Sequence, residues 1–398
     1  MKKAIKSIAD MVHQAEPSTA FTIVLWDGEE LKYGNSPQVT LHFKTKGALR
    51  RMMKDGFLGF GEAHMMGEID ISGDMAEILR LGFTIHFEYL RPSAMMMLRI
   101  FLFRLMTRDT VRQAPKNIAE HYDLGNDFYA LYLDRTMTYS CGYFRKNNDP
   151  LEQAQLNKYE HIARKLMLKE GETLLDIGCG WGGMLIYAAS KYGVKGRGVT
   201  LSRHQHEYAN EEIDRLGLKD LVSVEYKDYR ELDGKFDKIV SIGMFEHVGK
   251  RYIPNFMKKI ADLLAVGGVG LLHTIGKDRP TATDPWTLKY VFPGGYLPCL
   301  TEITREMGRC GFSVLDVENL RLHYAKTLEK WIENYERNAG KVMAMFDQVF
   351  VRRWRLFLHS SAAGFKYGNT RLFQVLFSNG LNNHLPLTRE HVYQNMGN

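Results

Sequence analysis

The sequence predicts an α/β fold with a parallel sheet for residues 121–398 and a small α+β domain for residues 1–90. Three observations support this division. Beyond residue 170, stretches with strand character alternate with helical stretches, an order that builds a parallel sheet with right-handed crossovers. A glycine-rich turn follows the first of these strands. The length of 398 residues is sufficient for two or three domains.

Strands and helices are both predicted in the small domain. The segment FTIVLWDGEELKYG predicts a hairpin that turns at Asp27 and Gly28, and QVTLHFK, residues 38–44, alternates like a third strand. GALRRMMKDG predicts a short helix that ends at Gly56. We then expect strand character with glycine breaks in residues 59–74 and a second helix in MAEILRLGF.

Two further features belong to this part of the chain. His64 stands alone near apolar neighbours and is interpreted as a structural residue. Residues 91–120 are predicted to form a helical linker, whose segment AMMMLRIFLFRLMT is apolar but interrupted by Arg99 and Arg104. The segment is too short and too charged to cross a membrane. Burial in a protein interface is slightly favoured over a position on a lipid surface with both arginines among the headgroups.

The strands of the larger domain are predicted from short apolar runs between helical stretches. We expect them at Thr173–Ile177, Gly196–Thr200, Val222–Tyr226, Lys238–Ile242 and Val269–Thr274. FSVLDVENLR adds a further strand, and the chain after Leu328 is predicted to be mostly helical. In an open sheet of this kind, the ligand lies at the carboxyl ends of the strands.

The composition limits the class of partner. A hydrophobic content of 45% and a charged content of 25% are ordinary for a folded soluble protein. The net charge of +7 favours an anionic partner, such as acidic lipid headgroups, phosphorylated ligands or nucleic acid. Nucleic acid is disfavoured, because the sequence has no dense Lys/Arg block, no zinc-finger spacing and no aromatic signature of RNA binding.

The cysteines and the apolar runs bear on location. None of Cys141, Cys179, Cys299 and Cys310 forms a CxxC pair, so neither a zinc site nor a disulfide framework is predicted. The N-terminus has basic residues but no apolar signal core, and no run reaches the roughly 18 to 20 apolar residues of a membrane span. A cytoplasmic protein is therefore expected.

The glycine-rich turn LLDIGCGWGGM indicates a ligand site. Gly178, Gly180 and Gly183 fit G-x-G-x-x-G between a predicted strand and a predicted helix. A dinucleotide would need an acidic residue at the end of the second strand, where the sequence has Val-Thr-Leu-Ser. Asp176 before the loop gives acid-x-Gly-x-Gly, typical of class I S-adenosylmethionine-dependent methyltransferases, and Asp228 follows the third strand, where such folds often bind adenine.

Five motifs in order make the resemblance specific. TYSCGYF, DIGCGWGG, VTLSRHQ, GMFEHVG and LHTIG are similar to those of cyclopropane-fatty-acyl-phospholipid synthases, whose catalytic portion is shared by the mycolic acid cyclopropane synthases. The similarity runs from about residue 115 to the C-terminus and extends more loosely to the N-terminal domain. It implies a Rossmann-like class I methyltransferase fold with added helices, and a catalytic domain at residues 121–398.

The resemblance implies a reaction and a donor site. The reaction is transfer of a methylene group from S-adenosylmethionine to the cis double bond of a phospholipid acyl chain, through a carbocation that loses a proton. The implied donor-binding residues are Tyr139, Ser140, Asp176, Gly178, Gly180, Thr200, Leu201, Gln205, Asp228, Tyr229, Ile242 and Gly243. Of these, Thr200 and Gln205 are expected to take the place of the missing acid.

The resemblance also implies a base site, in which a bicarbonate ion takes the proton. The matching residues are Cys141, Glu246, His273 and Tyr324, with the backbone of Ile275. His and Tyr side chains donate hydrogen bonds to an anion, and a Glu carboxylate orients or receives a proton. No covalent intermediate is needed, so Cys141 is not expected to be a nucleophile.

Aromatic side chains are expected around the cationic groups, because aromatic faces attract cations. The candidates are Tyr122, Phe128, Tyr129, Tyr139, Tyr143 and Phe144, although many of them are expected to be core. Some relatives carry a cysteine where this chain has Ser361, so no catalytic role is assigned to Ser361.

The expected partners follow from the resemblance and the charge. They are an unsaturated phospholipid, the inner face of a membrane through peripheral contact, and a second copy of the chain in a homodimer held in part by the N-terminal domains. Two alternatives stay open. One is a fatty-acyl methyltransferase that gives methyl-branched or hydroxylated lipid, and the other is a non-catalytic lipid-binding protein.

Overall fold

The computed structural model describes residues 1–84 and 124–393, which form two compact units. We call them the N-terminal unit and the sheet unit. The N-terminal unit contains residues 1–84, Thr283–Pro293 and Leu328–Asn369, and the sheet unit contains the other described residues. The predicted linker at 91–120, with Arg99 and Arg104, and the predicted aromatic Tyr122 lie outside the described residues.

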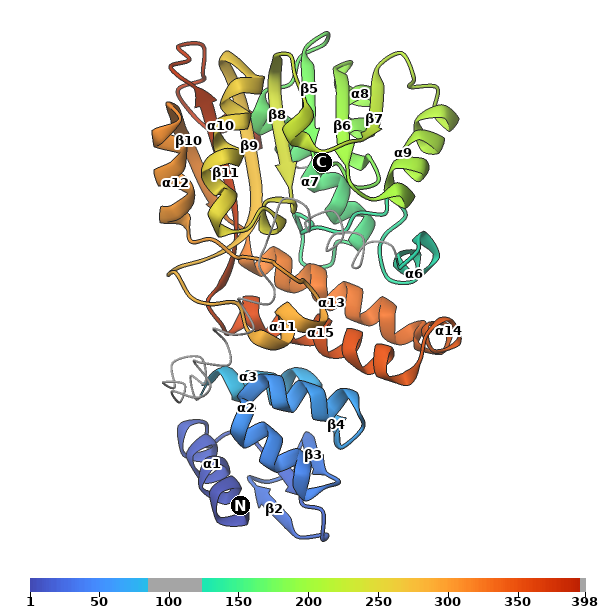
Figure 1. Ribbon diagram of the computed structural model, residues 1–398, viewed down its shortest axis with the longest axis vertical. Helices are drawn as coiled ribbons and strands as arrows, with labels where there is room; N and C mark the ends of the chain where they lie inside the picture. The colour runs from blue at the N-terminus through green and yellow to red at the C-terminus, as the bar shows by residue number, and fades with distance from the viewer. Residues whose placement is uncertain (85–123, 394–398) are drawn as a thin grey trace. The chain divides into compact units, whose positions relative to one another are not determined.

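The N-terminal unit is built on a four-stranded sheet in the order β2-β1-β3-β4 (Figure 1). The strand β1 is antiparallel to β2 and parallel to β3, and β4 is antiparallel to β3. The predicted hairpin and third strand are confirmed. The elements are α1 (Lys2–Ala15), β1 (Phe21–Val24), β2 (Glu30–Tyr33), β3 (Val39–Phe43), α2 (Lys46–Met65), β4 (Ile69–Gly73) and α3 (Met75–Thr84).

The prediction that a helix ends at Gly56 and that residues 59–74 have strand character is wrong in part. Gly56 has a φ of 58° and kinks α2, which then continues to Met65, so that the strand is restricted to Ile69–Gly73. The glycines allow close packing: a Cβ at Gly59 would lie 2.2 Å from the carbonyl oxygen of Arg51. A Cβ at Gly61 would lie 2.4 Å from the Trp286 ring.

A late helix completes the N-terminal unit. Arg352 on α15 (Gln348–Lys366) donates hydrogen bonds to the carbonyl oxygens of His64 and Ile69 and to the Asp70 carboxylate. His64 is buried, and its Nδ1 lies 3.2 Å from the Ile69 carbonyl, which agrees with a structural role. Because α15 packs on this unit, the compact units differ from the continuous 121–398 domain expected from the sequence.

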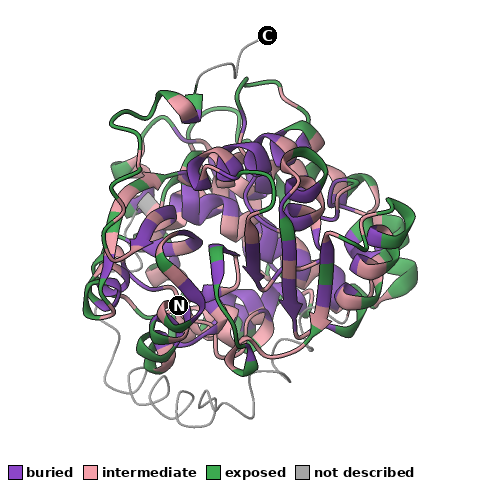
Figure 2. Ribbon diagram, turned by 90° about the horizontal axis from the view of Figure 1, so that it is seen from above, coloured by how far each residue is buried: buried purple, intermediate pink, exposed green. Residues whose placement is uncertain are grey.

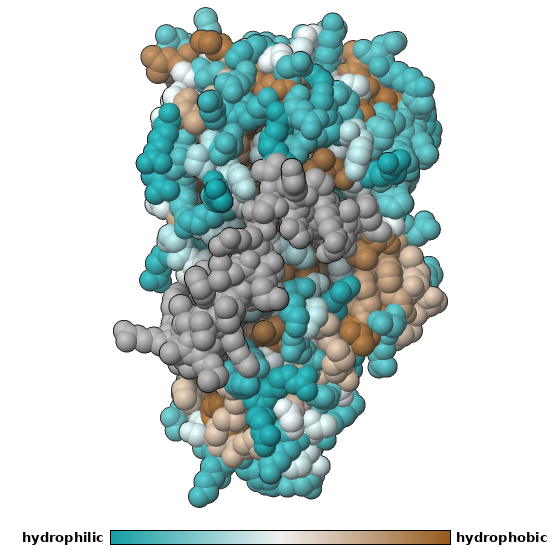
Figure 3. Space-filling view, in the orientation of Figure 1, coloured by the Kyte–Doolittle hydropathy of each residue, from teal (hydrophilic) through white to brown (hydrophobic). Residues whose placement is uncertain are grey.

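Three more helices are assigned wholly or partly to the N-terminal unit. They are α11 (Pro285–Tyr290), α14 (Ala339–Met345) and the later turns of α13 (Arg321–Arg337), whose first turns belong to the sheet unit. The exposed side chains of Met343 and Met345 lie on α14, where Figure 3 shows apolar colouring at the surface.

The sheet unit contains a seven-stranded sheet in the order β10-β11-β9-β8-β5-β6-β7. Strands β5 to β9 are mutually parallel, as predicted, while β11 is antiparallel to both neighbours. The strands are β5 (Thr173–Ile177), β6 (Lys195–Thr200), β7 (Val222–Tyr226), β8 (Phe236–Ile242), β9 (Leu264–Lys277), β10 (Phe312–Asn319) and β11 (Thr370–Asn379).

Helices cover both faces of this sheet, and the buried residues are concentrated in and beside it (Figure 2). One apolar cluster packs α10 and α12 against the strands, and a second packs α7, α8 and α9. The helices are α6 (Asn126–Ala130), α7 (Leu151–Leu166), α8 (Gly183–Tyr192), α9 (Arg203–Arg215), α10 (Ile253–Leu263), α12 (Leu300–Arg309) and α16 (Glu390–Tyr393).

The strand β11 was not predicted, because the chain after Leu328 was expected to be mostly helical. The sequence TRLFQVLFSN is apolar with little alternation, since β11 lies between β9 and β10 and is covered on both faces. A short apolar run of this kind cannot be distinguished from a buried helix by periodicity.

Candidate active site

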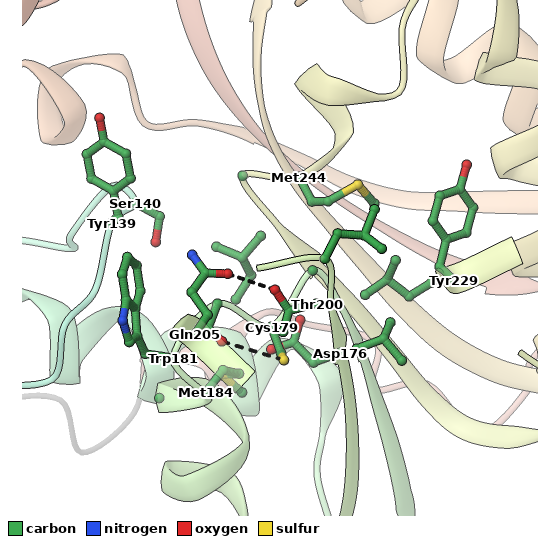
Figure 4. Close-up of a pocket in the computed structure, with 18 of the residues that line it drawn as sticks. Tyr139, Ser140, Asp176, Cys179, Trp181, Met184, Thr200, Gln205, Tyr229 and Met244 are labelled. Carbon is green, nitrogen blue, oxygen red and sulfur yellow. Dashed lines mark hydrogen bonds between the residues drawn. The ribbon is translucent and has the colours of Figure 1, made fainter. Parts of the chain in front are cut away.

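A pocket opens at the carboxyl ends of β5, β6 and β8, the position expected for a ligand in this fold (Figure 4). It is lined by every residue that the sequence predicted to hold the donor. These residues are Tyr139, Ser140, Asp176, Gly178, Gly180, Thr200, Leu201, Gln205, Asp228, Tyr229, Ile242 and Gly243. The five residues predicted for the base site do not line this pocket.

The glycine loop connects β5 to α8 with a backbone that other residues rarely adopt. Gly178 has a φ of 82° and Gly180 a φ of 56°. A Cβ at Gly178 would lie 2.5 Å from the side chain of Met244, which lines the same pocket. A Cβ at Gly183 would lie 2.2 Å from the hydroxyl oxygen of Tyr159. The glycines therefore keep the loop narrow where it borders the pocket.

Thr200 and Gln205 form a pair at the end of β6. The Thr200 hydroxyl donates to Oε1 of Gln205 at 2.7 Å, and both residues are buried. This contact fixes the amide, so that its nitrogen is directed away from Thr200 and toward the side where Ser140 and Tyr139 lie (Figure 4). An amide donor thus stands where dinucleotide-binding folds carry an acid.

Asp228 and Tyr229 border the pocket after β7. Asp228 accepts hydrogen bonds from the backbone and the side chain of Arg230. Burial raises the pKa of Asp228, but the contacts with Arg230 outweigh burial and lower it. A carboxylate at this position can accept hydrogen bonds from a ligand.

Lys158 is a pocket residue that the sequence analysis missed. It lies on α7, is 1% exposed, and donates a hydrogen bond to the Ser140 hydroxyl at 2.9 Å. Burial lowers its pKa to about 7, and burial raises the pKa of Asp176 in the same pocket to about 7. The one available signal was a lysine among the apolar positions of α7.

Glu246 and His273 are buried and do not line the donor pocket. Oε1 of Glu246 accepts from the backbone N–H of Ile275 at 2.5 Å. Oε2 of Glu246 and Nε2 of His273 have no hydrogen-bond partner among the described residues. Burial raises the pKa of Glu246 to about 7 and lowers that of His273 well below its usual value.

A backbone contact links the two sites. The N–H of Gly243, which lines the donor pocket, donates to the carbonyl oxygen of His273 at 2.9 Å. In the sheet, His273 on β9 pairs with Ile242, another pocket residue, on β8. The carboxyl end of β8 therefore borders the donor pocket and holds the strand that carries His273.

Cys141 is fully buried, and burial raises the pKa of its thiol, which donates to the carbonyl oxygen of Gly142. This environment opposes a nucleophilic role. Tyr324 lies half-buried on α13. Its helix contacts the segment after Cys141, since the N–H of Gly142 donates to the Thr327 hydroxyl.

Three of the six predicted aromatics form a group beside the pocket. Tyr129 is in ring contact with Phe128 and with Tyr139, and Trp181 of the glycine loop joins them through Tyr129. Tyr143 instead stacks between His161 and His323. Phe144 also lies near His323. Ser361 lies on α15 and is not part of the pocket lining.

This fold and pocket define an S-adenosylmethionine-dependent methyltransferase. Residues 109–375 match the family described as mycolic acid cyclopropane synthetase, and the chain belongs to this family. Residues 9–93 match a domain of unknown function.

Three relatives show how far the similarity extends. A probable fatty acid methyltransferase of Pseudomonas putida is 36% identical over 93% of this chain and 95% of its own. The cyclopropane-fatty-acyl-phospholipid synthase of Escherichia coli (strain K12) is 36% identical over 89% of this chain and 92% of its own. The crystal structure of a mycolic acid cyclopropane synthase complexed with SAH and CTAB is 33% identical, with a TM-score of 0.64 over 66% of this chain and 98% of that chain.

Proposed function

We propose that the protein transfers a methylene group from S-adenosylmethionine to the cis double bond of an unsaturated phospholipid acyl chain and closes a cyclopropane ring. The observation that carries the proposal is that Glu246 and His273 are both buried and that each has an unpartnered polar atom. Glu246 contacts the strand that carries His273 through the backbone N–H of Ile275. Buried polar atoms are normally hydrogen-bonded, so two such atoms indicate a place for a small polar ligand or a proton. Ring closure needs such a place, because it releases one proton.

The donor is held by the residues that line the pocket. When bound, S-adenosylmethionine supplies an electrophilic methyl group. The amide nitrogen of Gln205 offers a hydrogen-bond donor, and the carboxylate of Asp228 offers an acceptor. The ring of Tyr229 offers an apolar face. Lys158 orients the Ser140 hydroxyl at the opposite wall.

Bicarbonate fits the base site in part. When bound, it supplies the base that the proposed reaction requires. Nε2 of His273 can donate to it, and Oε2 of Glu246 can accept from its protonated oxygen. The N–H of Ile275 already donates to Glu246, so in this structure its role is to orient the carboxylate. We include Cys141 and Tyr324 in the proposed site on the strength of the family motifs alone.

A second function uses the same sites. The Pseudomonas putida relative, as similar as the Escherichia coli synthase, is named a probable fatty acid methyltransferase. Such an activity would leave a methyl group on the acyl chain without ring closure. The two functions differ only in the fate of the reacting chain after methyl transfer, so the product distinguishes them.

We further propose peripheral contact with the inner membrane face and assembly into a homodimer. Exposed methionines occur in the N-terminal unit, on α1, α2 and α14, as Met11, Met53, Met343 and Met345. Together with the net charge of +7, they suit shallow insertion beside anionic headgroups. None of the helices in residues 1–84 and 124–393 is long and apolar enough to cross a membrane.

The test is turnover on vesicles of unsaturated phospholipid with S-adenosylmethionine and bicarbonate, with the acyl chains analysed by mass and proton NMR. A gain of one CH2 with cyclopropane signals is expected. A methyl-branched or methyl-and-hydroxyl product would overturn ring closure and leave the methyltransferase assignment intact. The same vesicles, sedimented with and without anionic lipid, test membrane contact, which is contradicted if the protein stays in the supernatant in both.

A further inference from the structure

A line of polar side chains extends from His273 to Glu318. Nδ1 of His273 lies 3.2 Å from Nε2 of Gln374, the residue that pairs with it on β11. Oε1 of Gln374 accepts from Nζ of Lys165 at 2.8 Å, and Lys165 also donates to Glu318 at 2.5 Å. His161 contacts the same Glu318 oxygen at 2.7 Å. Gln374 and Lys165 are 0% and 1% exposed.

The chemistry of lysine fixes the orientation of this line. A lysine ammonium has three donors and no acceptor, so the atom of Gln374 that faces Lys165 is the amide oxygen. The amide nitrogen then faces His273 and donates to Nδ1. A neutral imidazole with an accepting Nδ1 carries its hydrogen on Nε2. The contacts of Nδ1 with Gln374, and of Gln374 with Lys165, thus determine the tautomer of His273.

Burial lowers the pKa of Lys165, and its contact with Glu318 opposes this shift. Burial raises the pKa of Glu318, but the contacts with His161 and Lys165 outweigh it and lower this pKa to about 2. Glu318 is therefore a carboxylate, and its side chain is 22% exposed at the outer end of the line. Removing one member of a buried ion pair leaves the other charge uncompensated, so these residues act as a set.

We propose that Gln374, Lys165 and Glu318 are positioning residues that lock His273 in the tautomer with hydrogen on Nε2. The free Nε2–H then donates a hydrogen bond to an anionic oxygen, and His273 does not take the proton released in the reaction. The base is instead an oxygen group, either the bound anion or the Glu246 carboxylate. This inference rests on the proposed function for its catalytic meaning, but the tautomer itself does not depend on that function.

The tautomer is measured directly by NMR of the full-length protein labelled with ¹⁵N-histidine, without substrate. His273→Asn assigns the signals by their disappearance. The expected result is a one-bond coupling to hydrogen at Nε2 of His273 and none at Nδ1. A proton on Nδ1 in the unmodified protein would overturn the lock, whatever the protein's activity.

The isosteric variant Gln374→Glu sharpens the test. A carboxylate still accepts from Lys165 but has no hydrogen to give, so Nδ1 of His273 must become the donor. We expect Nδ1 to gain a proton, and kcat to fall at least about tenfold, as changes in residues that orient a functional group typically cause. Gln153→Glu makes the same change on an exposed part of α7 and should alter neither signal nor rate.

Three further outcomes decide the remaining parts of the inference. Lys165→Met should give a mixture of both tautomers in protein that melts cooperatively, and a spectrum like that of the unmodified protein would remove Lys165 from the lock. If Gln374→Glu moves the proton but leaves kcat unchanged, the lock has no catalytic role. A methyl-branched product in the unmodified protein would instead contradict ring closure, while the NMR result would still stand.

Discussion

The donor pocket and the proposed Glu246–His273 site are built in different ways. They are linked by the hydrogen bond from the N–H of Gly243, in the pocket, to the carbonyl oxygen of His273. The donor pocket is lined by loops that directly follow β5, β6 and β8, in which Gly178, Gly180 and Gly243 have positive φ. The second site is formed by buried side chains whose partners come from β9, β11, α7 and β10. The pocket is thus encoded locally, and the second site by long-range packing.

The difference also separates binding from chemistry. Residues of the pocket offer a shape and a set of hydrogen bonds, and their loss should weaken donor binding. Glu246 and His273 offer unpartnered polar atoms in a dry environment, where electrostatic interactions are stronger than in water. Their loss should lower turnover and leave donor binding unchanged. Each prediction below tests one side of this contrast.

The largest effect is expected for Glu246→Gln. The substitution keeps the shape and removes the charge that orients or receives a proton, so turnover should fall by about 100-fold to 10,000-fold. The dissociation constant of S-adenosylmethionine, measured by calorimetry, should stay within about twofold, because Glu246 does not line the pocket. If Glu246→Gln weakened donor binding as much as it lowered turnover, Glu246 would contribute to donor binding as well as to the chemical step.

For Gly178→Ala we expect weaker donor binding with little change in turnover. The added Cβ meets Met244 at 2.5 Å on a residue with a φ of 82°, and overpacking of about 1–3 kcal/mol corresponds to about 5-fold to about 150-fold in donor affinity. Turnover at saturating donor should change less. Gly180→Ala is the matched control, since its Cβ would meet nothing within 4 Å although its φ is 56°. Equal losses in both variants would assign the effect to backbone strain alone.

The same contrast explains what the sequence predicted. The five parallel strands were predicted from short apolar runs, and the glycine turn from its place between a strand and a helix start. The set of donor residues was implied by the resemblance of the motifs to those of the family. Lys158, Lys165 and Gln374 were missed, because their contacts cross 18 to 209 positions of the chain. No local pattern reports that a buried lysine faces a glutamine on a distant strand.

The N-terminal unit shows a related limit. Its hairpin was predicted from turn residues, but the second half of α2 was interpreted as a strand because its glycines suggested breaks. Those glycines are required by contacts with Arg51 and Trp286, and the second of these residues lies more than 200 positions further along. A glycine that permits close packing and a glycine that ends an element look the same in the sequence.

A smaller change in binding is expected for Gln205→Glu. The carboxylate can still accept from the Thr200 hydroxyl but loses the amide hydrogens directed into the pocket. Loss of one such hydrogen bond, about 1 kcal/mol, should weaken S-adenosylmethionine binding about fivefold, with kcat nearly unchanged. Calorimetry and initial rates at saturating donor separate the two quantities. A fall in kcat with unchanged donor affinity would show that Gln205 acts in the chemical step and not in donor binding.

The last prediction concerns the stability of the protein without ligand. Burial raises the pKa of Glu246 from 4.5 to about 7, so the folded state binds this proton more tightly than the unfolded state. The resulting stability is fully present below the unfolded pKa and is lost as pH rises through about 7. The free energy of unfolding should therefore decrease between about pH 5 and about pH 8.

Glu246→Gln should flatten this decrease, since an amide does not titrate in that range, and urea unfolding at both pH values measures the difference. Asp176 gives the matched test in the donor pocket, because burial also raises its pKa to about 7 while Lys158 opposes the shift. Asp176→Asn should flatten the profile in the same direction. If neither variant changes the slope, both carboxyl groups are ionised in the folded protein at about pH 5, and a polar interior must replace the dry one inferred for the base site.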